Sequence, residues 1–148
     1  MLFSSPVHSL FMVPLEVTHT AMVTKQVLKM LHGGADAPVS KFRAAIHDLL
    51  LFFKDTYQEV FQFDDPPLHD PLAVLWVLRP DLFETRRWYV EVDTGCNPLT
   101  AGQTLVDKLG ILKREPNCTV ATRVDVDAFW RIMEESVAKA DARSPMNG

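Results

Sequence analysis

The chain has few cysteines, no excess of positive charge and no long apolar run, and each of these absences excludes a class of protein. Its two cysteines, Cys96 and Cys118, form neither a disulfide framework nor a metal-binding spacing, so a reducing, cytoplasmic setting is expected. The net charge is −4 and the lysines and arginines are scattered, which argues against a nucleic-acid partner. No basic residue precedes an apolar core at the start of the chain, so we expect neither a signal peptide nor a membrane association.

The composition that remains is that of a globular protein. Hydrophobic residues make up 47% of the 148 residues and charged residues 23%, which is enough for a core and carries no signature of disorder. No internal repeat and no linker divides the sequence. We therefore expect residues 1–148 to belong to one domain, with a frayed tail from Asp141 onwards.

Hydrophobic periodicity predicts strands and helices in mixed order. The segment Phe11–Thr18 is apolar and β-branched without a helical period, which indicates a buried strand. Alternation of period two predicts three further strands, at Trp88–Val92, Thr104–Val106 and Cys118–Thr122. Capping residues predict helices that begin at or just after Thr24, Ser40, Asp70 and Asp125. This mixture predicts an α/β fold, with an open sheet flanked by helices.

The stretch Pro66–Pro71 is the most informative part of the sequence, because it places His69 beside Asp70 between rigid prolines. Each proline has a locked φ and pushes its predecessor towards extended geometry. One interpretation is structural: Asp70 caps the apolar helix Leu72–Leu78, with Pro71 in the first turn. The other interpretation is a functional site, in which the imidazole and the carboxylate are aimed at one small volume.

Further segments accompany this pair in a characteristic order. They are Val13–His19 upstream, and Arg79–Phe83, Val90–Thr94, Leu99–Thr104 and Asp125–Trp130 downstream. In this order the chain resembles the C-terminal half of an inosine-uridine preferring nucleoside hydrolase. The resemblance implies the corresponding half of an open mixed sheet, incomplete without an N-terminal half. Members of that family carry an aspartate cluster, D-x-D-x-x-x-D-D, in their first half, and this sequence contains no such cluster.

The resemblance also implies a reaction, the hydrolysis of a ribonucleoside to a free base and ribose. His69 would protonate the leaving base, a task that suits histidine because its pKa lies close to neutrality. Tyr57 would contact the base, and Phe53, one turn earlier, would extend the same wall. The alternative for Tyr57 is a half-buried packing residue with a solvated hydroxyl, and the alternative for Phe53 is packing in the core, which the sequence favours for that residue. His19 ends the upstream segment, and we expect it to serve a structural hydrogen bond.

The same resemblance implies a cofactor. Asp70 would be one ligand of a calcium ion that binds the ribose and the attacking water. The other carboxylate ligands, and the general base, would come from the N-terminal half. The present sequence offers one carboxylate of such a site.

Two other interpretations stay open on the sequence alone. Without the aspartate cluster, the chain can be a truncated, non-catalytic product that at most associates with a full-length homologue. It can also be an unrelated α/β binding module in which the His69–Asp70 pair is a helix cap. If the strand Phe11–Thr18 lies uncovered, its apolar edge predicts self-association or a homo-oligomer.

Overall fold

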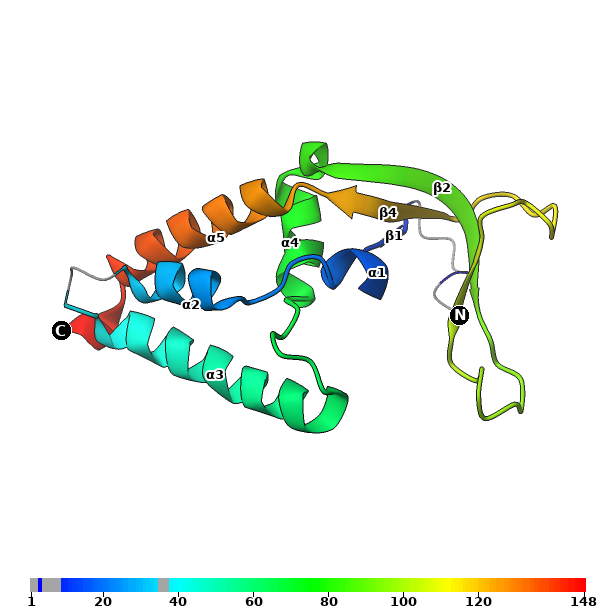
Figure 1. Cartoon of the computed structure of the whole chain (residues 1–148). Helices are drawn as coiled ribbons and strands as arrows, with labels where there is room; N and C mark the ends of the chain where they lie inside the picture. Colours follow the sequence, from blue (N-terminus) through cyan, green and yellow to red (C-terminus); the bar gives the residue numbers. More distant parts are fainter. Residues whose placement is uncertain (1–2, 4–8, 35–37) are drawn as a thin grey trace. The chain divides into compact units, whose positions relative to one another are not determined.

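The structure is a computed structural model that describes residue 3 and residues 9–34 and 38–148, and these residues form two compact units (Figure 1). The first unit is built on a sheet and comprises the described residues up to Val17 together with Phe83–Val124. The second unit is helical and comprises Thr18–Leu82 and Asp125–Gly148. Each unit therefore combines segments that lie far apart in the sequence.

Four strands make up the sheet of the first unit: β1 (Phe11–Met12), β2 (Phe83–Val92), β3 (Thr104–Asp107) and β4 (Cys118–Val124). Their order is β1-β4-β2-β3. β1 runs parallel to β4, whereas β2 is antiparallel to both β4 and β3. Val90, Cys118 and Val120 form the buried core of the sheet. The predicted α/β class and the open mixed sheet are thus confirmed.

The strand predicted over Phe11–Thr18 is wrong beyond its first two residues. The helix α1 (Leu15–Thr18) follows β1 almost at once. Pro14 is the physical reason, because it has no N–H to donate to a neighbouring strand. Its carbonyl instead accepts a hydrogen bond from the Val17 N–H at 3.0 Å, which starts a helical turn. In the part of the chain that the structure describes, the strand on this side of the sheet is therefore two residues long.

Four longer helices make up most of the second unit: α2 (Lys25–His32), α3 (Lys41–Phe61), α4 (Asp70–Leu78) and α5 (Val126–Asp141). Three predicted caps are confirmed, because the side chains of Thr24, Ser40 and Asp125 accept hydrogen bonds from backbone N–H groups of the first turns. Gly33 ends α2 in the left-handed conformation, at φ 107°.

Buried side chains of three helices form the core of the second unit. α2 contributes Val27, Leu28 and Leu31, α4 contributes Leu72 and Leu75, and α5 contributes Ala128, Phe129, Trp130 and Val137. None of the side chains of α3 is buried, although this is the longest helix. No helix in the described ranges is both long and apolar enough to cross a membrane.

The end of the chain differs from the frayed tail that the sequence suggested. Residues Pro145–Asn147 form a short 3₁₀ helix after α5. The Asn147 amide donates to the carbonyl and carboxylate oxygens of Asp141, at 2.8 and 2.9 Å. Its side-chain oxygen accepts from the Phe42 N–H at 3.2 Å. These hydrogen bonds hold the last residues against the start of α3.

Candidate functional site

Two loop segments of the second unit are joined by backbone hydrogen bonds, and their pairing positions the site. The Val23 N–H donates to the Pro66 carbonyl at 2.9 Å, and the Leu68 N–H donates to the Ala21 carbonyl at 3.0 Å. Met22 and Pro67 form an isolated antiparallel bridge between these two bonds. The pairing brings the end of α1 next to the start of α4.

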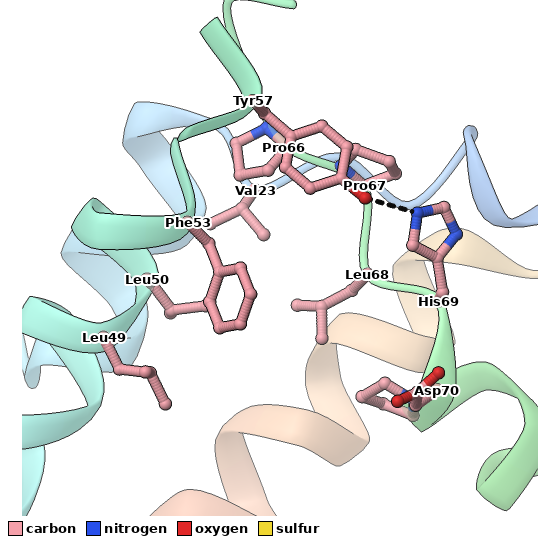
Figure 2. Close-up of a pocket in the computed structure, with 11 residues that line it drawn as sticks. Val23, Leu49, Leu50, Phe53, Tyr57, Pro66, Pro67, Leu68, His69 and Asp70 are labelled. Carbon is pink, nitrogen blue, oxygen red and sulfur yellow. Dashed lines mark hydrogen bonds between the residues drawn. The ribbon is translucent and has the colours of Figure 1, made fainter. Parts of the chain in front are cut away.

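His69 lies between two hydroxyl groups at this junction. Its Nε2 is 2.9 Å from the hydroxyl of Tyr57, near the end of α3 (Figure 2). Its Nδ1 is 2.7 Å from the hydroxyl of Thr18, the last residue of α1. The structure therefore brings together His69 and Tyr57, which the sequence named separately. Thr18 is a contact that sequence reasoning missed, and the only available signal was its place inside the segment Val13–His19.

The environment of His69 favours the neutral imidazole. Burial lowers the pKa of His69 below its ordinary value, and the nearby His19 lowers it further, whereas Asp70 raises it. The ring centroids of His19 and His69 are 5.5 Å apart, and the rings of His19 and Phe63 form a T-shaped pair. A neutral imidazole offers one N–H donor and one acceptor, so the two neighbouring hydroxyls can satisfy both nitrogens.

A cavity of about 270 Å³ opens beside the His69–Tyr57 pair (Figure 2). Apolar side chains from α3 and from the two paired loops form most of its wall, and Phe53 and Leu68 point into it. Phe53 is 46% exposed, which leaves its ring available to a ligand. The polar groups of His69 and Tyr57 stand at one side of this apolar wall. Such a cavity suits a small, flat ligand that has a hydrogen-bonding edge.

Asp70 does not cap α4, so the structural interpretation of this residue is wrong. It is the first residue of the helix itself, and the cap position is taken by His69, whose side chain makes no capping hydrogen bond. A capping residue needs a non-helical backbone from which its side chain can reach back to the first N–H groups. The carboxylate of Asp70 is instead exposed beside the cavity.

The described residues do not by themselves fit a calcium site. Calcium takes six to eight oxygen ligands, of which several are normally carboxylates. Within the ranges that the structure describes, no group of three or more His, Cys, Asp or Glu side chains is placed to hold a metal ion. Among the described residues that line the cavity beside His69, Asp70 is the one carboxylate.

Comparison with known proteins relates the chain to one family. Residues 1–131 match the family model described as inosine-uridine preferring nucleoside hydrolase. A probable ribonucleoside hydrolase of Dictyostelium discoideum is 39% identical over 128 residues, which are 85% of this chain and 37% of that protein. A pyrimidine-specific ribonucleoside hydrolase of Escherichia coli K12 is 31% identical over 128 residues, which are 86% of this chain and 39% of that protein.

A solved structure agrees with these matches. The purine-preferring ribonucleoside hydrolase from Gardnerella vaginalis superimposes with a TM-score of 0.72 at 24% identity. The superposition covers 92% of this chain and 42% of that protein, and it shows a shared fold. The chain thus spans well under two thirds of the length of each of these three proteins.

Proposed function

This chain belongs to the inosine-uridine preferring nucleoside hydrolase family, and from that premise we propose that it supplies the leaving-group side of a ribonucleoside hydrolase active site. The observation that carries the proposal is the contact of 2.9 Å between the Tyr57 hydroxyl and His69 Nε2, at the wall of an apolar cavity. The cavity would receive the nucleobase, and the pair would meet its hydrogen-bonding edge.

Base binding rests on the aromatic side chains of α3. Phe53 and Tyr57 lie one turn apart on this helix, and both line the cavity. Aromatic rings stack on flat heterocycles in offset or edge-on arrangements, which contribute about 0.5–1.5 kcal/mol beyond burial of their area. The partly exposed ring of Phe53 would cover one face of the base. The hydroxyl of Tyr57 would approach its edge.

Cleavage of the N-glycosidic bond needs a proton on the departing base. Water adds its oxygen to the anomeric carbon and gives up one proton to a general base that the described residues do not supply. The bond from this carbon to the base nitrogen breaks, and the base leaves with the electron pair. Protonated His69, with Tyr57 in contact with its Nε2, would deliver the proton that neutralises this charge. Because the pKa of His69 is lowered, its protonated form is a stronger acid, and that form becomes scarcer as the pH rises.

The water-activating side of the reaction is not assigned to this chain. The described residues do not fit a calcium site alone, and we derive no step through that ion. The role of Asp70 as one calcium ligand stays a prediction, and it requires further ligands from outside the described residues. Ribonucleosides in general are the proposed substrates, since the relatives include both purine-preferring and pyrimidine-specific enzymes.

A second candidate is a non-catalytic chain that associates with a longer homologue. Two observations favour it: the chain spans 37% of its Dictyostelium relative, and among the described residues that line the cavity only Asp70 carries a carboxylate. The two candidates agree on the fold and on the family. They differ in whether His69 takes part in a reaction when the rest of the fold is supplied.

The experiment supplies an N-terminal segment and varies the leaving group. We would complete the chain with the N-terminal segment of the Dictyostelium relative and measure hydrolysis of inosine, uridine and p-nitrophenyl riboside. His69→Ala should slow inosine hydrolysis by about 10²–10⁴-fold, the usual range for general acid catalysis. It should largely spare p-nitrophenyl riboside, whose leaving group departs readily without a proton.

His47→Ala is the matched control. His47 lies on the same helix as Tyr57, but it packs against His32 and does not line the cavity. This control should hydrolyse all three substrates normally. Equal slowing of inosine and p-nitrophenyl riboside by His69→Ala would show that His69 is scaffold and not the acid. If the chain associates with the added N-terminal segment but hydrolyses none of the three substrates, the result would favour the non-catalytic candidate.

A further inference from the structure

We propose that Thr18 is a positioning residue for His69: its hydroxyl holds the imidazole in the tautomer that carries the proton on Nδ1. Nε2 is then the nitrogen that faces Tyr57 and the cavity, and it alone exchanges a proton there. The inference rests on the proposed function for the role of His69 as acid. The tautomer itself can be measured without any reaction.

The contact between Thr18 and His69 is short and well enclosed. Thr18 Oγ1 and His69 Nδ1 are 2.7 Å apart, and only 3% of Thr18 is exposed. Most threonines lie at least partly at the surface, so such deep burial of a hydroxyl calls for polar partners. His69 Nδ1 supplies one of these partners.

The backbone around Thr18 fixes the direction of this contact. The Thr18 carbonyl accepts from the Ala21 N–H at 3.0 Å, which turns the chain immediately after α1. The Ala21 carbonyl in turn accepts from the Leu68 N–H, and Leu68 immediately precedes His69. A short chain of backbone hydrogen bonds therefore connects the two residues, and Ala21 is fully buried within it. The backbone of Thr18 is thereby tied to the backbone next to His69.

The chemistry of proton transfer favours an acceptor at Nδ1. Both ring nitrogens of an imidazolium carry a proton, and transfer from Nε2 leaves the neutral tautomer with its proton on Nδ1. A hydroxyl oxygen that accepts from Nδ1–H stabilises the ring before and after this transfer. A metal-ligating or catalytic imidazole is commonly oriented in this way, through the hydrogen bond that its other nitrogen makes.

Tyr57 cannot replace Thr18 in this role. Its hydroxyl lies 2.9 Å from Nε2 and can donate to that nitrogen or accept from it, so it is compatible with either tautomer. The other charged or titratable groups near the ring, His19 and Asp70, act through space on its charge. Among the contacts described for this ring, only Thr18 touches Nδ1.

The test reads the tautomer directly in the chain as it exists. We would label histidine with ¹⁵N and record the Nδ1 and Nε2 shifts of His69 at about pH 8.5, above the ordinary histidine pKa of about 6.5. The wild-type ring should be mainly in the Nδ1–H form. Thr18→Val keeps the shape but removes the hydroxyl, and it should shift the tautomer ratio towards Nε2–H by about threefold to tenfold, the range for loss of one neutral hydrogen bond.

Two variants separate the hydroxyl from mere packing. Thr18→Ser keeps the hydroxyl and should retain the wild-type tautomer, while Thr56→Val is a matched control on α3 whose hydroxyl bonds to the Phe52 carbonyl. A wild-type ring in the Nε2–H form, or an unchanged ratio in Thr18→Val, would overturn the proposal. So would a Thr18→Ser protein that behaves like Thr18→Val.

Tyr57→Phe keeps the proposal testable even if Thr18→Val fails to fold. This variant removes the partner at Nε2 and should leave the proton on Nδ1. Conversion of the ring to the Nε2–H form would show that Tyr57, and not Thr18, sets the tautomer. Failure of the acid role would appear instead in the leaving-group experiment on His69→Ala, so the two ideas fail separately.

Discussion

At the scale of single residues, Arg43 joins three helices through its guanidinium group. Its Nη1 donates to the Leu31 carbonyl at 2.7 Å, near the end of α2. Its other nitrogens meet the carboxylates of Glu134 and Asp141 on α5, at 3.3 and 3.1 Å. Only 11% of the Arg43 side chain is exposed, so these contacts are shielded better than an ordinary surface ion pair.

Asp141 gives this network a pH dependence. A hydrogen bond from Ser40 lowers the pKa of Asp141 most, and Asn147 and Arg43 lower it further. A carboxylate whose pKa is lower in the folded than in the unfolded state stabilises the fold above the unfolded pKa, and this contribution is lost as the pH falls. We therefore expect the free energy of unfolding to decrease below about pH 4, and to decrease less steeply in Asp141→Asn. Urea titrations at several pH values would measure the free energy of unfolding of both proteins.

The control for this prediction is Asp55→Asn, which changes an exposed carboxylate on α3. It should follow the wild-type pH dependence. If Asp141→Asn and the wild type lost stability in parallel as the pH fell, the ion network would not be the source of the acid sensitivity.

At the scale of elements, α4 is unusual because it is apolar on more than one face. Leu72 and Leu75 are buried in the core, yet Val74, Val77 and Leu78 are 59%, 77% and 67% exposed. No charged residue interrupts the helix between Leu72 and Leu78. A helix that is hydrophobic all round is normally covered on all sides. In the isolated chain this second face is open to water.

This exposure predicts self-association through α4. The two-residue strand β1 offers little edge for pairing, so the homo-oligomer expected from the sequence should depend on the helix instead. We expect the isolated chain to elute at concentration-dependent, larger-than-monomer size in size-exclusion chromatography. Val77→Lys should shift it towards monomer, whereas Leu109→Lys, at an 84% exposed residue outside α4, should not. A sharp wild-type monomer peak at every concentration would contradict this expectation.

At the scale of the whole molecule, the chain holds part of a family fold. It spans 37–42% of the three relatives described above. The described residues place an acid candidate and an aromatic wall around a cavity, but only one carboxylate beside it. Stabilisation of the departing base alone lowers only part of the barrier to hydrolysis.

We therefore expect the isolated chain to be a poor hydrolase. Ribose release from inosine and uridine in excess calcium should stay far below the usual enzymatic range of about 1–10³ s⁻¹. A full-length nucleoside hydrolase assayed beside it provides the positive control. Turnover within that range by the isolated chain would show that its own residues complete the site.

The sequence by itself determined the parts of this protein that depend on local chemistry. Thr24, Ser40 and Asp125 begin helices where their side chains predicted, because a cap acts on the N–H groups of the next turn. The residue patterns around His69 likewise identified the family, which the comparisons confirm.

Tertiary structure decided the contacts between residues that lie far apart in the sequence. Thr18 and His69 are 51 residues apart, and no periodicity reports that a loop pairing brings their side chains together. The helix that begins at Asp70 was predicted, but Asp70 is itself the first helical residue and His69 takes the cap position, so Asp70 is not the cap. Pro14 shortened a strand whose apolar pattern continued, because pairing needs an N–H as well as a hydrophobic side chain. Contacts of this kind arise only when separate segments pack, which is why the partner of His69 Nδ1 became visible only in the folded chain.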